Sequence, residues 1–199
     1  FICQYILTAS RIARIRPMTI IVQTGDKVLR KTAKEVLLAE IKTAKIRDIL
    51  KKMTGALSNA KDGVALAAPQ IGIPLRIFIV LKEYTENKTA REIKEIQEKK
   101  EKTPRPAKTE IAVFINPKII KISKKKQTVR EGCLSVAGMF GEMNRAEKVT
   151  IEAYDEKGKK FSRGASGLLA QIFQHEMDHL NGVLFTDTAT NLEKIETKK

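Results

Sequence analysis

The sequence predicts a mixed α and β fold, and three observations lead to this expectation. Apolar residues recur at helical spacing before residue 58 and again near the C-terminus, whereas several short stretches between them alternate apolar and polar residues. The chain has 199 residues, 42% of them hydrophobic, which suits one globular domain with a buried core. No apolar run reaches the length of a membrane span, so we expect no membrane insertion.

A helix is the first element that the pattern predicts, from about residue 36 to residue 57, because an approximate apolar stripe runs along this segment. The stripe consists of Leu37, Ile41, Ala44, Ile49, Met53 and Leu57. Residues 62–72 follow as a loop of small residues with an apolar body. Residues 76–81 alternate as a strand does, and residues 111–122 predict another strand. Asn116 and Pro117 interrupt the latter, which suggests an edge position or a bulge.

Residues 85–110 differ in kind from their neighbours, because more than half of them are charged. Pairs such as Arg91/Glu95 and Lys94/Glu98 lie at i,i+4, which favours a solvated helix that ends before Pro104. We interpret this segment as a surface insertion between two strands. A partner-binding role is the alternative.

A hairpin and a helix are expected in the C-terminal part. Residues 148–154 alternate, and a turn over residues 155–158 leads into a second strand. Ser166 can cap the next helix, and Asn181 with Gly182 can end it.

That helix carries the most informative motif of the chain, QHEMDH over residues 174–179. Positions i and i+4 lie on one face of a helix, so His175 and His179 can bind one metal ion. Glu176 is placed to act as general base on water that the metal activates. Asp178 can orient a ligand or pair with Arg145, and a solvent-facing side chain is the alternative. The motif predicts a metal-dependent hydrolase.

The motif leaves the third metal ligand open. Catalytic zinc sites usually have three protein ligands. Downstream, Glu193 and Glu196 lie in a polar tail, and Phe185 stands where a metzincin requires His. Upstream, Cys133 is either a thiolate ligand or a small buried hydrophobe. Two cysteines are too few for a disulfide framework, which favours a reducing compartment.

Three segments resemble, in this order, the three motifs of the peptide deformylase family. They are GVALAAPQIG (63–72), EGCLS (131–135) and QHEMDH (174–179). The resemblance covers nearly all of residues 18–187, with residues 85–110 as the main exception. It implies an α+β fold with antiparallel or mixed β-sheets packed around a central HExxH helix. It also implies a catalytic domain over residues 18–190 and a polar, basic tail over residues 191–199.

The resemblance further implies a site and a reaction. Cys133, His175 and His179 would bind one divalent metal ion, with ferrous iron expected and zinc or nickel able to substitute. Glu176 would be the general base, and the Gln70 side chain with the Leu134 backbone N–H would stabilise the oxyanion. The substrate would be the N-formyl group on the initiator methionine of a nascent peptide, and formate would be released.

Methionine needs an apolar slot, since its unbranched thioether carries no charge. By position, the candidates to line this slot are Val64, Ala65, Leu134, Leu168 and Ile172, with plain core packing as the alternative for each. Ala65 stands where the family usually has Gly. We therefore expect an altered rate or peptide preference.

Bulk charge and the N-terminus bear on partners and location. The net charge of +15 favours polyanions, and the ribosome is a candidate partner through the basic surface, although excess lysine serves solubility equally well. Residues 1–17 carry three arginines and no acidic residue, as organellar targeting segments do. We interpret them first as an upstream or expression-derived extension. We expect a monomer in the bacterial cytoplasm, or in an organelle if residues 1–17 are a targeting segment.

Two other functions are alternatives to the deformylase hypothesis. A metallopeptidase would need the missing downstream ligand. A ribosome- or RNA-associated binding protein on a deformylase fold, with weak or no activity, would account for the charge and for Ala65. A composition with 5% aromatic residues and no Trp offers little sign of a base-stacking platform.

Overall fold

The computed structural model describes residues 19–60, 62–86, 91, 92, 95, 96, 98 and 109–195. Its α-helices and β-strands are, in chain order, α1 (Ala44–Asn59), β1 (Ala65–Ala67), β2 (Ile77–Leu81), β3 (Ile111–Ile122), β4 (Lys126–Cys133), β5 (Val136–Ala146), β6 (Lys148–Tyr154), β7 (Lys160–Ser166), α3 (Gly167–Leu180) and β8 (Thr190–Lys194). Within this described part, no helix is long and apolar enough to cross a membrane.

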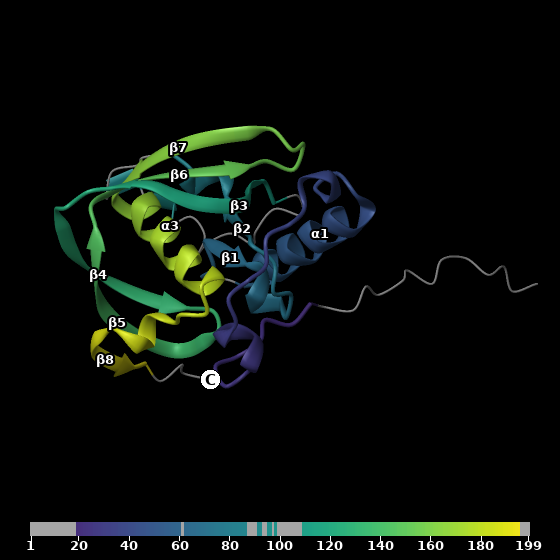
Figure 1. Ribbon diagram of the computed structural model, residues 1–199. Helices are drawn as coiled ribbons and strands as arrows, with labels where there is room; N and C mark the ends of the chain where they lie inside the picture. The colour runs from purple at the N-terminus through teal and green to yellow at the C-terminus, as the bar shows by residue number, and fades with distance from the viewer. Residues whose placement is uncertain are drawn as a thin grey trace, which may run out of the picture.

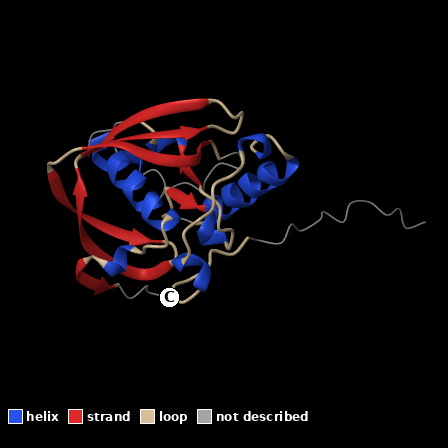
Figure 2. Cartoon of the chain, viewed as in Figure 1, coloured by secondary structure: helices blue, strands red, loops and turns tan. Residues whose placement is uncertain are grey.

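Two antiparallel sheets lie on either side of helix α3 (Figure 1). The larger sheet has the strand order β1-β2-β3-β6-β7, and the smaller has the order β4-β5-β8. Strands β3, β6 and β7 lie above α3 in the view, and β4, β5 and β8 lie to its left and below it. Figure 2 shows α1 as a second long helix at the other end of the molecule. The prediction of an α+β fold with antiparallel sheets is confirmed.

Helix α1 begins later than the apolar stripe predicted. Thr43 is its N-cap residue, and the Thr43 hydroxyl accepts a hydrogen bond from the Ile46 N–H at 3.5 Å. Leu37 is 67% exposed and precedes a short 3-10 helix, Leu38–Glu40. The predicted start near residue 36 was therefore wrong. The cap at Thr43 sets the boundary, which a count of apolar residues does not detect.

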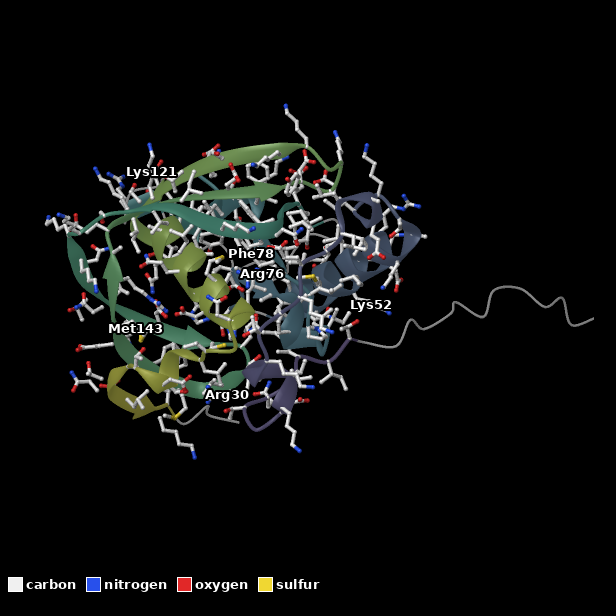
Figure 3. All side chains as sticks on the ribbon, viewed as in Figure 1. Arg30, Lys52, Arg76, Phe78, Lys121 and Met143 are labelled. Carbon is white, nitrogen blue, oxygen red and sulfur yellow. The ribbon has the colours of Figure 1, made fainter. Side chains whose placement is uncertain are left out.

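The main core packs α1 and α3 against the larger sheet. All five residues of β2 are buried, so this strand is covered on both faces. Phe78 of β2 stacks on Phe114 of β3 with ring centroids 4.6 Å apart, and Phe173 of α3 packs edge-on against Phe114 at 5.2 Å. In Figure 3 Phe78 lies in the middle of the molecule, whereas Lys52 and Lys121 lie toward its edges. These rings fix α3 against the sheet.

The interruption at Asn116 and Pro117 is a β-bulge. The register between β3 and β6 shifts between Ile115 and Lys118, and Asn116 has a φ of 51°. The buried Asn116 side chain accepts a hydrogen bond from the Val36 N–H at 2.8 Å and donates one to the Val36 carbonyl at 2.7 Å. Since β3 lies between β2 and β6, the bulge was predicted correctly and the edge position was wrong.

The predicted hairpin consists of β6 and β7, which pair along their length. Ser166 is the N-cap residue of α3, although its side chain makes no capping hydrogen bond to this helix. At the other end Asn181 is the C-cap residue, and Gly182 adopts a φ of 77°. The boundaries predicted for the motif helix are therefore confirmed, whereas the capping bond from Ser166 is absent from the described structure.

The charged insertion is described in part. Its helical residues are Arg91, Glu92, Glu95, Ile96 and Glu98. Arg91 Nε donates a hydrogen bond to Glu95 Oε1 at 3.1 Å, as the i,i+4 spacing predicted. Ile96 packs against the main core, so the described part of this segment has an apolar anchor and is not wholly solvated. Lys94 and Pro104 lie outside the described residues.

The smaller sheet was not predicted. Cys133 is the last residue of β4, and Leu134 with Ser135 forms the turn into β5. Residues 190–194, expected in large part as a polar tail, form β8 against β5. A second, smaller core lies beside this sheet and contains Leu29, Val136, Met143, Leu184 and Phe185.

We predict that Phe173→Ala lowers the free energy of unfolding by about 3–5 kcal/mol, because a ring with no exposed surface leaves a cavity between α3 and the sheet. Urea denaturation measures this loss. Ile120→Ala is the control, since Ile120 is 47% exposed and should change stability by less than about 0.5 kcal/mol. Equal effects of the two substitutions would contradict the packing described here.

Candidate functional site

Helix α3 and the end of β4 bring three potential metal ligands together. His175 and His179 lie one turn apart on α3, and Cys133 ends β4. The ligand atoms of the three residues all lie within 4.8 Å of one another. Cys133 Sγ is 3.2 Å from His179 Nε2. The three residues that the sequence suggested as ligands thus lie next to one another in the structure.

The turn that follows Cys133 is held by residues 23 and 24. Thr24 N–H donates a hydrogen bond to the Ser135 carbonyl at 2.7 Å, and Gln23 Nε2 donates one to the Leu134 carbonyl at 3.1 Å. Ser135 N–H in turn donates to Cys133 Sγ at 3.4 Å. The thiol therefore has a defined position, with a backbone donor at its sulfur.

A buried ion-pair network supports His175. Arg145 of β5 donates two hydrogen bonds to the Glu131 carboxylate of β4, both at 2.8 Å. Glu131 Oε2 lies 3.0 Å from His175 Nδ1. Arg145 also donates to Asp178 Oδ2 at 2.6 Å, so the pairing considered for Asp178 is confirmed. With Nδ1 engaged by a carboxylate, His175 keeps Nε2 for a metal.

Burial would raise the pKa of Glu131, but hydrogen bonds and charge from Arg145 and His175 outweigh it and lower that pKa to about 2. Glu131 is 4% exposed and stays ionised across the neutral range. A permanent carboxylate behind His175 makes its ring a better ligand.

Glu176 differs from Glu131, because no Lys or Arg of the described residues forms an ion pair with its carboxylate. Its side chain is buried, and its Oε2 has no hydrogen-bond partner within the described residues. Burial raises the pKa of Glu176 to about 7. A carboxyl group with this pKa and a free oxygen can accept and return a proton near neutral pH.

Gln70 points its side-chain amide group toward Cys133. The Ala67 N–H donates a hydrogen bond to Gln70 Oε1 at 2.8 Å. This bond fixes the side chain so that its NH2 group points away from Ala67. Gln70 Nε2 lies 3.2 Å from Ser135 Oγ and 3.5 Å from Cys133 Sγ. This orientation suits a donor to an oxygen that becomes negative next to the thiol.

A cavity of about 400 Å³ opens onto these groups. It is lined by the residues named as candidates for the methionine slot, which are Val64, Ala65, Leu134, Leu168 and Ile172. Cys133, His175, Glu176 and Gln70 line it as well. Ala65 lies on β1 at the wall, so its methyl group takes up space that Gly would leave open.

The competing ligands lie elsewhere. Glu193 is on β8, where its carboxylate pairs with Arg130 at 2.8 Å, and Glu196 lies outside the described residues. Phe185, in the position of the metzincin His, packs against the His175 ring with centroids 6.5 Å apart.

Sequence reasoning missed two parts of the site. The sequence analysis assigned no role to Glu131. Its position two residues before Cys133 in the EGCLS motif could have indicated that it lies near the metal ligands. The anchors at Gln23 and Thr24 carry no motif, and contacts across more than 100 residues leave no local pattern.

The donors present fit a divalent metal. One thiolate and two imidazole nitrogens form a set that zinc and ferrous iron both accept. The spread of these donors and the carboxylate behind His175 match such a site. The general base and amide donor lie around the same point, so the arrangement can hydrolyse a carbonyl compound that enters the cavity.

Comparisons with known proteins agree with this geometry. The family model for polypeptide deformylase matches residues 18–195. Peptide deformylase 2 of Clostridium acetobutylicum is 38% identical over 169 residues, which cover 85% of this chain and 93% of that protein. Peptide deformylase 1A, chloroplastic/mitochondrial, of Arabidopsis thaliana is 40% identical over 169 residues, which cover 84% of this chain and 60% of that protein.

Solved structures resemble the fold as well. The crystal structure of a peptide deformylase from Synechococcus elongatus in complex with actinonin superimposes with a TM-score of 0.69 and 33% sequence identity. The match covers 92% of this chain and 87% of that one.

We predict that Cys133→Ala removes the bound metal, because two imidazoles without the thiolate leave the site one ligand short. Metal analysis after dialysis should give near one ion per chain for the parent protein and near none for this variant. Cys3→Ala is the matched control and should retain its metal. A full equivalent of metal on Cys133→Ala would contradict the ligand set.

We also predict that Arg145→Leu lowers the free energy of unfolding by about 3–5 kcal/mol, because it leaves the buried Glu131 carboxylate without its cation. Arg47→Leu, on the exposed face of α1, should cost less than about 0.5 kcal/mol. The double variant Arg145→Leu/Glu131→Leu should recover part of the stability and still bind metal weakly. No difference between Arg145→Leu and Arg47→Leu in urea denaturation would rule out the proposed network.

Proposed function

The chain belongs to the polypeptide deformylase family, which removes the N-formyl group from nascent peptides, and from this we propose how its own residues perform the reaction. Cys133, His175 and His179 would hold one divalent metal ion. The observation that carries the proposal is the convergence of these three donors, Glu176 and Gln70 on one cavity. A divalent metal there would supply Lewis acidity, which activates water and polarises the formyl carbonyl.

Glu176 would act as the proton carrier. Its unpaired Oε2 takes a proton from the attacking water, and the carboxyl group then delivers that proton to the leaving amine. The oxygen of water adds to the formyl carbon, the C–N bond breaks, and formate and a free peptide amine leave. A pKa raised to about 7 by burial suits a group that must both accept and donate.

Gln70 and Leu134 would stabilise the charge that develops on the formyl oxygen. The Gln70 amide is already oriented by Ala67, so it needs no reorganisation during the reaction. The Leu134 N–H belongs to the turn that Gln23 and Thr24 anchor. Donors held in this way lower the barrier more than mobile ones do.

The apolar part of the cavity would take the methionine side chain. Val64, Leu168 and Ile172 line it beside His175, close to the point where the formyl group must lie. A formyl group offers little to recognise, so the side chain and the peptide backbone must provide affinity.

Two open sheet edges would bind the peptide backbone. Strand β1 ends the larger sheet and β4 ends the smaller one, and residues of both strands line the cavity. An extended peptide can pair with such edges through backbone hydrogen bonds. Gly132 lies on the edge of β4 next to Cys133 and lines the cavity.

The native metal, location and partners are proposed on chemical grounds. Ferrous iron is the metal we expect, with zinc or nickel able to replace it. The protein would work where translation starts with formylmethionine, in a bacterial cytoplasm or an organelle. Lys121 at the end of β3 and the three lysines 124–126 that lead into β4 form a basic surface that suits contact with the ribosome. We expect a monomer with one catalytic domain over residues 18–190.

A binding protein without activity has no support from the comparisons. Every group that the chemistry requires is present, and Ala65 leaves the cavity open. The effect of Ala65 on rate or preference stays a prediction.

We predict that Glu176→Gln lowers kcat for formate release from formyl-Met-Ala-Ser by about 10²–10⁴-fold, because the amide cannot carry the proton. The substitution keeps the size of the side chain, so metal content measured on the same sample should not change. Glu156→Gln, in the turn between β6 and β7, is the control and should retain full activity. Undiminished formate release by Glu176→Gln would refute this assignment.

A further inference from the structure

The cavity face of α3 carries a polar side chain that the reaction described above does not use. The residues of this face that line the cavity include Leu168, Gln171, Ile172 and His175, which recur at helical spacing. Gln171 lies one turn, about 5.4 Å along the helix axis, before His175. Its half-buried side chain therefore lies in the slot proposed for methionine, between Leu168 and the end at which the formyl group is expected.

The Gln171 amide group is held in one orientation. Its Nε2 donates a hydrogen bond to the carbonyl of Arg130 on β4 at 2.9 Å. Because a carbonyl oxygen only accepts, the nitrogen end of the amide must face β4. A primary amide has two N–H groups, and within the described residues neither the second N–H nor Oε1 of Gln171 makes a hydrogen bond. The side chain thus keeps a donor for a ligand in the cavity.

The charged side chains of β4 that line the cavity do not compete for this position. Glu131 is bound to His175, with Oε2 at 3.0 Å from Nδ1. The Arg130 guanidinium lies over the Phe140 ring, with Cζ at 5.3 Å from the ring centre. Successive side chains of a strand point to opposite faces, so this cation lies on the face of β4 away from Glu131 and α3. A polar ligand atom inside the slot would therefore meet the Gln171 amide.

An oxidised methionine has the chemistry that this amide fits. Oxidation of the thioether to the sulfoxide makes the side chain polar and the sulfur chiral. In a wholly apolar slot the sulfoxide oxygen would be buried without a hydrogen-bond partner, which is unfavourable. Here the second N–H of Gln171 can donate to that oxygen, while Leu168 and Ile172 pack on the carbon atoms of the same side chain.

We propose that Gln171 forms a subsite for methionine sulfoxide, so that the protein also removes the formyl group from peptides whose N-terminal formylmethionine is oxidised. This inference rests on the proposed function and adds a substrate class to it. The sulfoxide takes no part in the bond changes. Water still adds to the formyl carbon, the C–N bond breaks, and the sulfoxide leaves unchanged on the free peptide amine.

The test measures formate release by metal-loaded protein from formyl-Met-Ala-Ser and from the two sulfoxide epimers of this peptide. The parent protein should cleave one epimer with a kcat/KM within about tenfold of that for the methionine peptide, because a hydrogen bond offsets most of the cost of burying the oxygen. The other epimer should react more slowly, since a donor held at one place reaches the oxygen of one configuration. Gln171→Met keeps the length of the side chain and removes the donor. It should lower kcat/KM for the favoured epimer by about 5- to 100-fold and change that for the methionine peptide by less than about threefold.

Gln127→Met is the matched control, because it makes the same change on β4 outside the cavity lining. It should keep the epimer preference of the parent protein. A Gln171 that serves structure alone, by tying α3 to β4, would on substitution slow all three peptides equally. That result would overturn the subsite, as would a parent protein that cleaves neither epimer or both equally. Release from formyl-Met-Ala-Ser in these cases would keep the proposed deformylase reaction intact, whereas no release from any peptide would overturn both.

Discussion

The buried contact of Arg145 with Glu131 is the interaction on which the site depends. It joins β5 to β4 and, through His175 and Asp178, ties both strands to α3. The Glu131 and Asp178 carboxylates and the Arg145 guanidinium stabilise the fold only together, because burying any one of these charges without its partner costs free energy. The network therefore sets the distance between the smaller sheet and the helix, and that distance decides whether Cys133 can meet the two histidines.

Helix α3 packs an apolar face against the larger sheet and presents a polar face to the smaller one. Toward the larger sheet it presents Phe173, which packs on the rings of β2 and β3. Toward the smaller sheet it presents His175, Glu176 and His179, all largely buried yet polar. The aromatic contacts hold the helix rigid, so the polar groups keep their geometry without solvent. As a consequence, Glu176 is buried without a counterion in the described part of the chain. The same burial raises its pKa to about 7, which suits proton transfer.

Local patterns were sufficient for part of this account. The α3 boundaries, the β6–β7 hairpin and the bulge in β3 follow from caps, alternation and an Asn-Pro step, each within a few residues. The start of α1 was missed because Leu37 looks like a core residue and faces solvent. The smaller sheet was missed because β4 and β8 are rich in polar residues and owe their structure to pairing with β5. Arg145 and Glu131 meet only through that pairing, so no sequence pattern assigned them together.

The central claim is that Cys133, His175 and His179 form one metal centre within this frame. X-ray absorption spectroscopy on the zinc-loaded protein tests it most directly, since sulfur and nitrogen ligands scatter differently. The account predicts one sulfur at about 2.3 Å and two imidazole nitrogens at about 2.0–2.1 Å. A spectrum without sulfur, or with nitrogen and oxygen ligands alone, would contradict it.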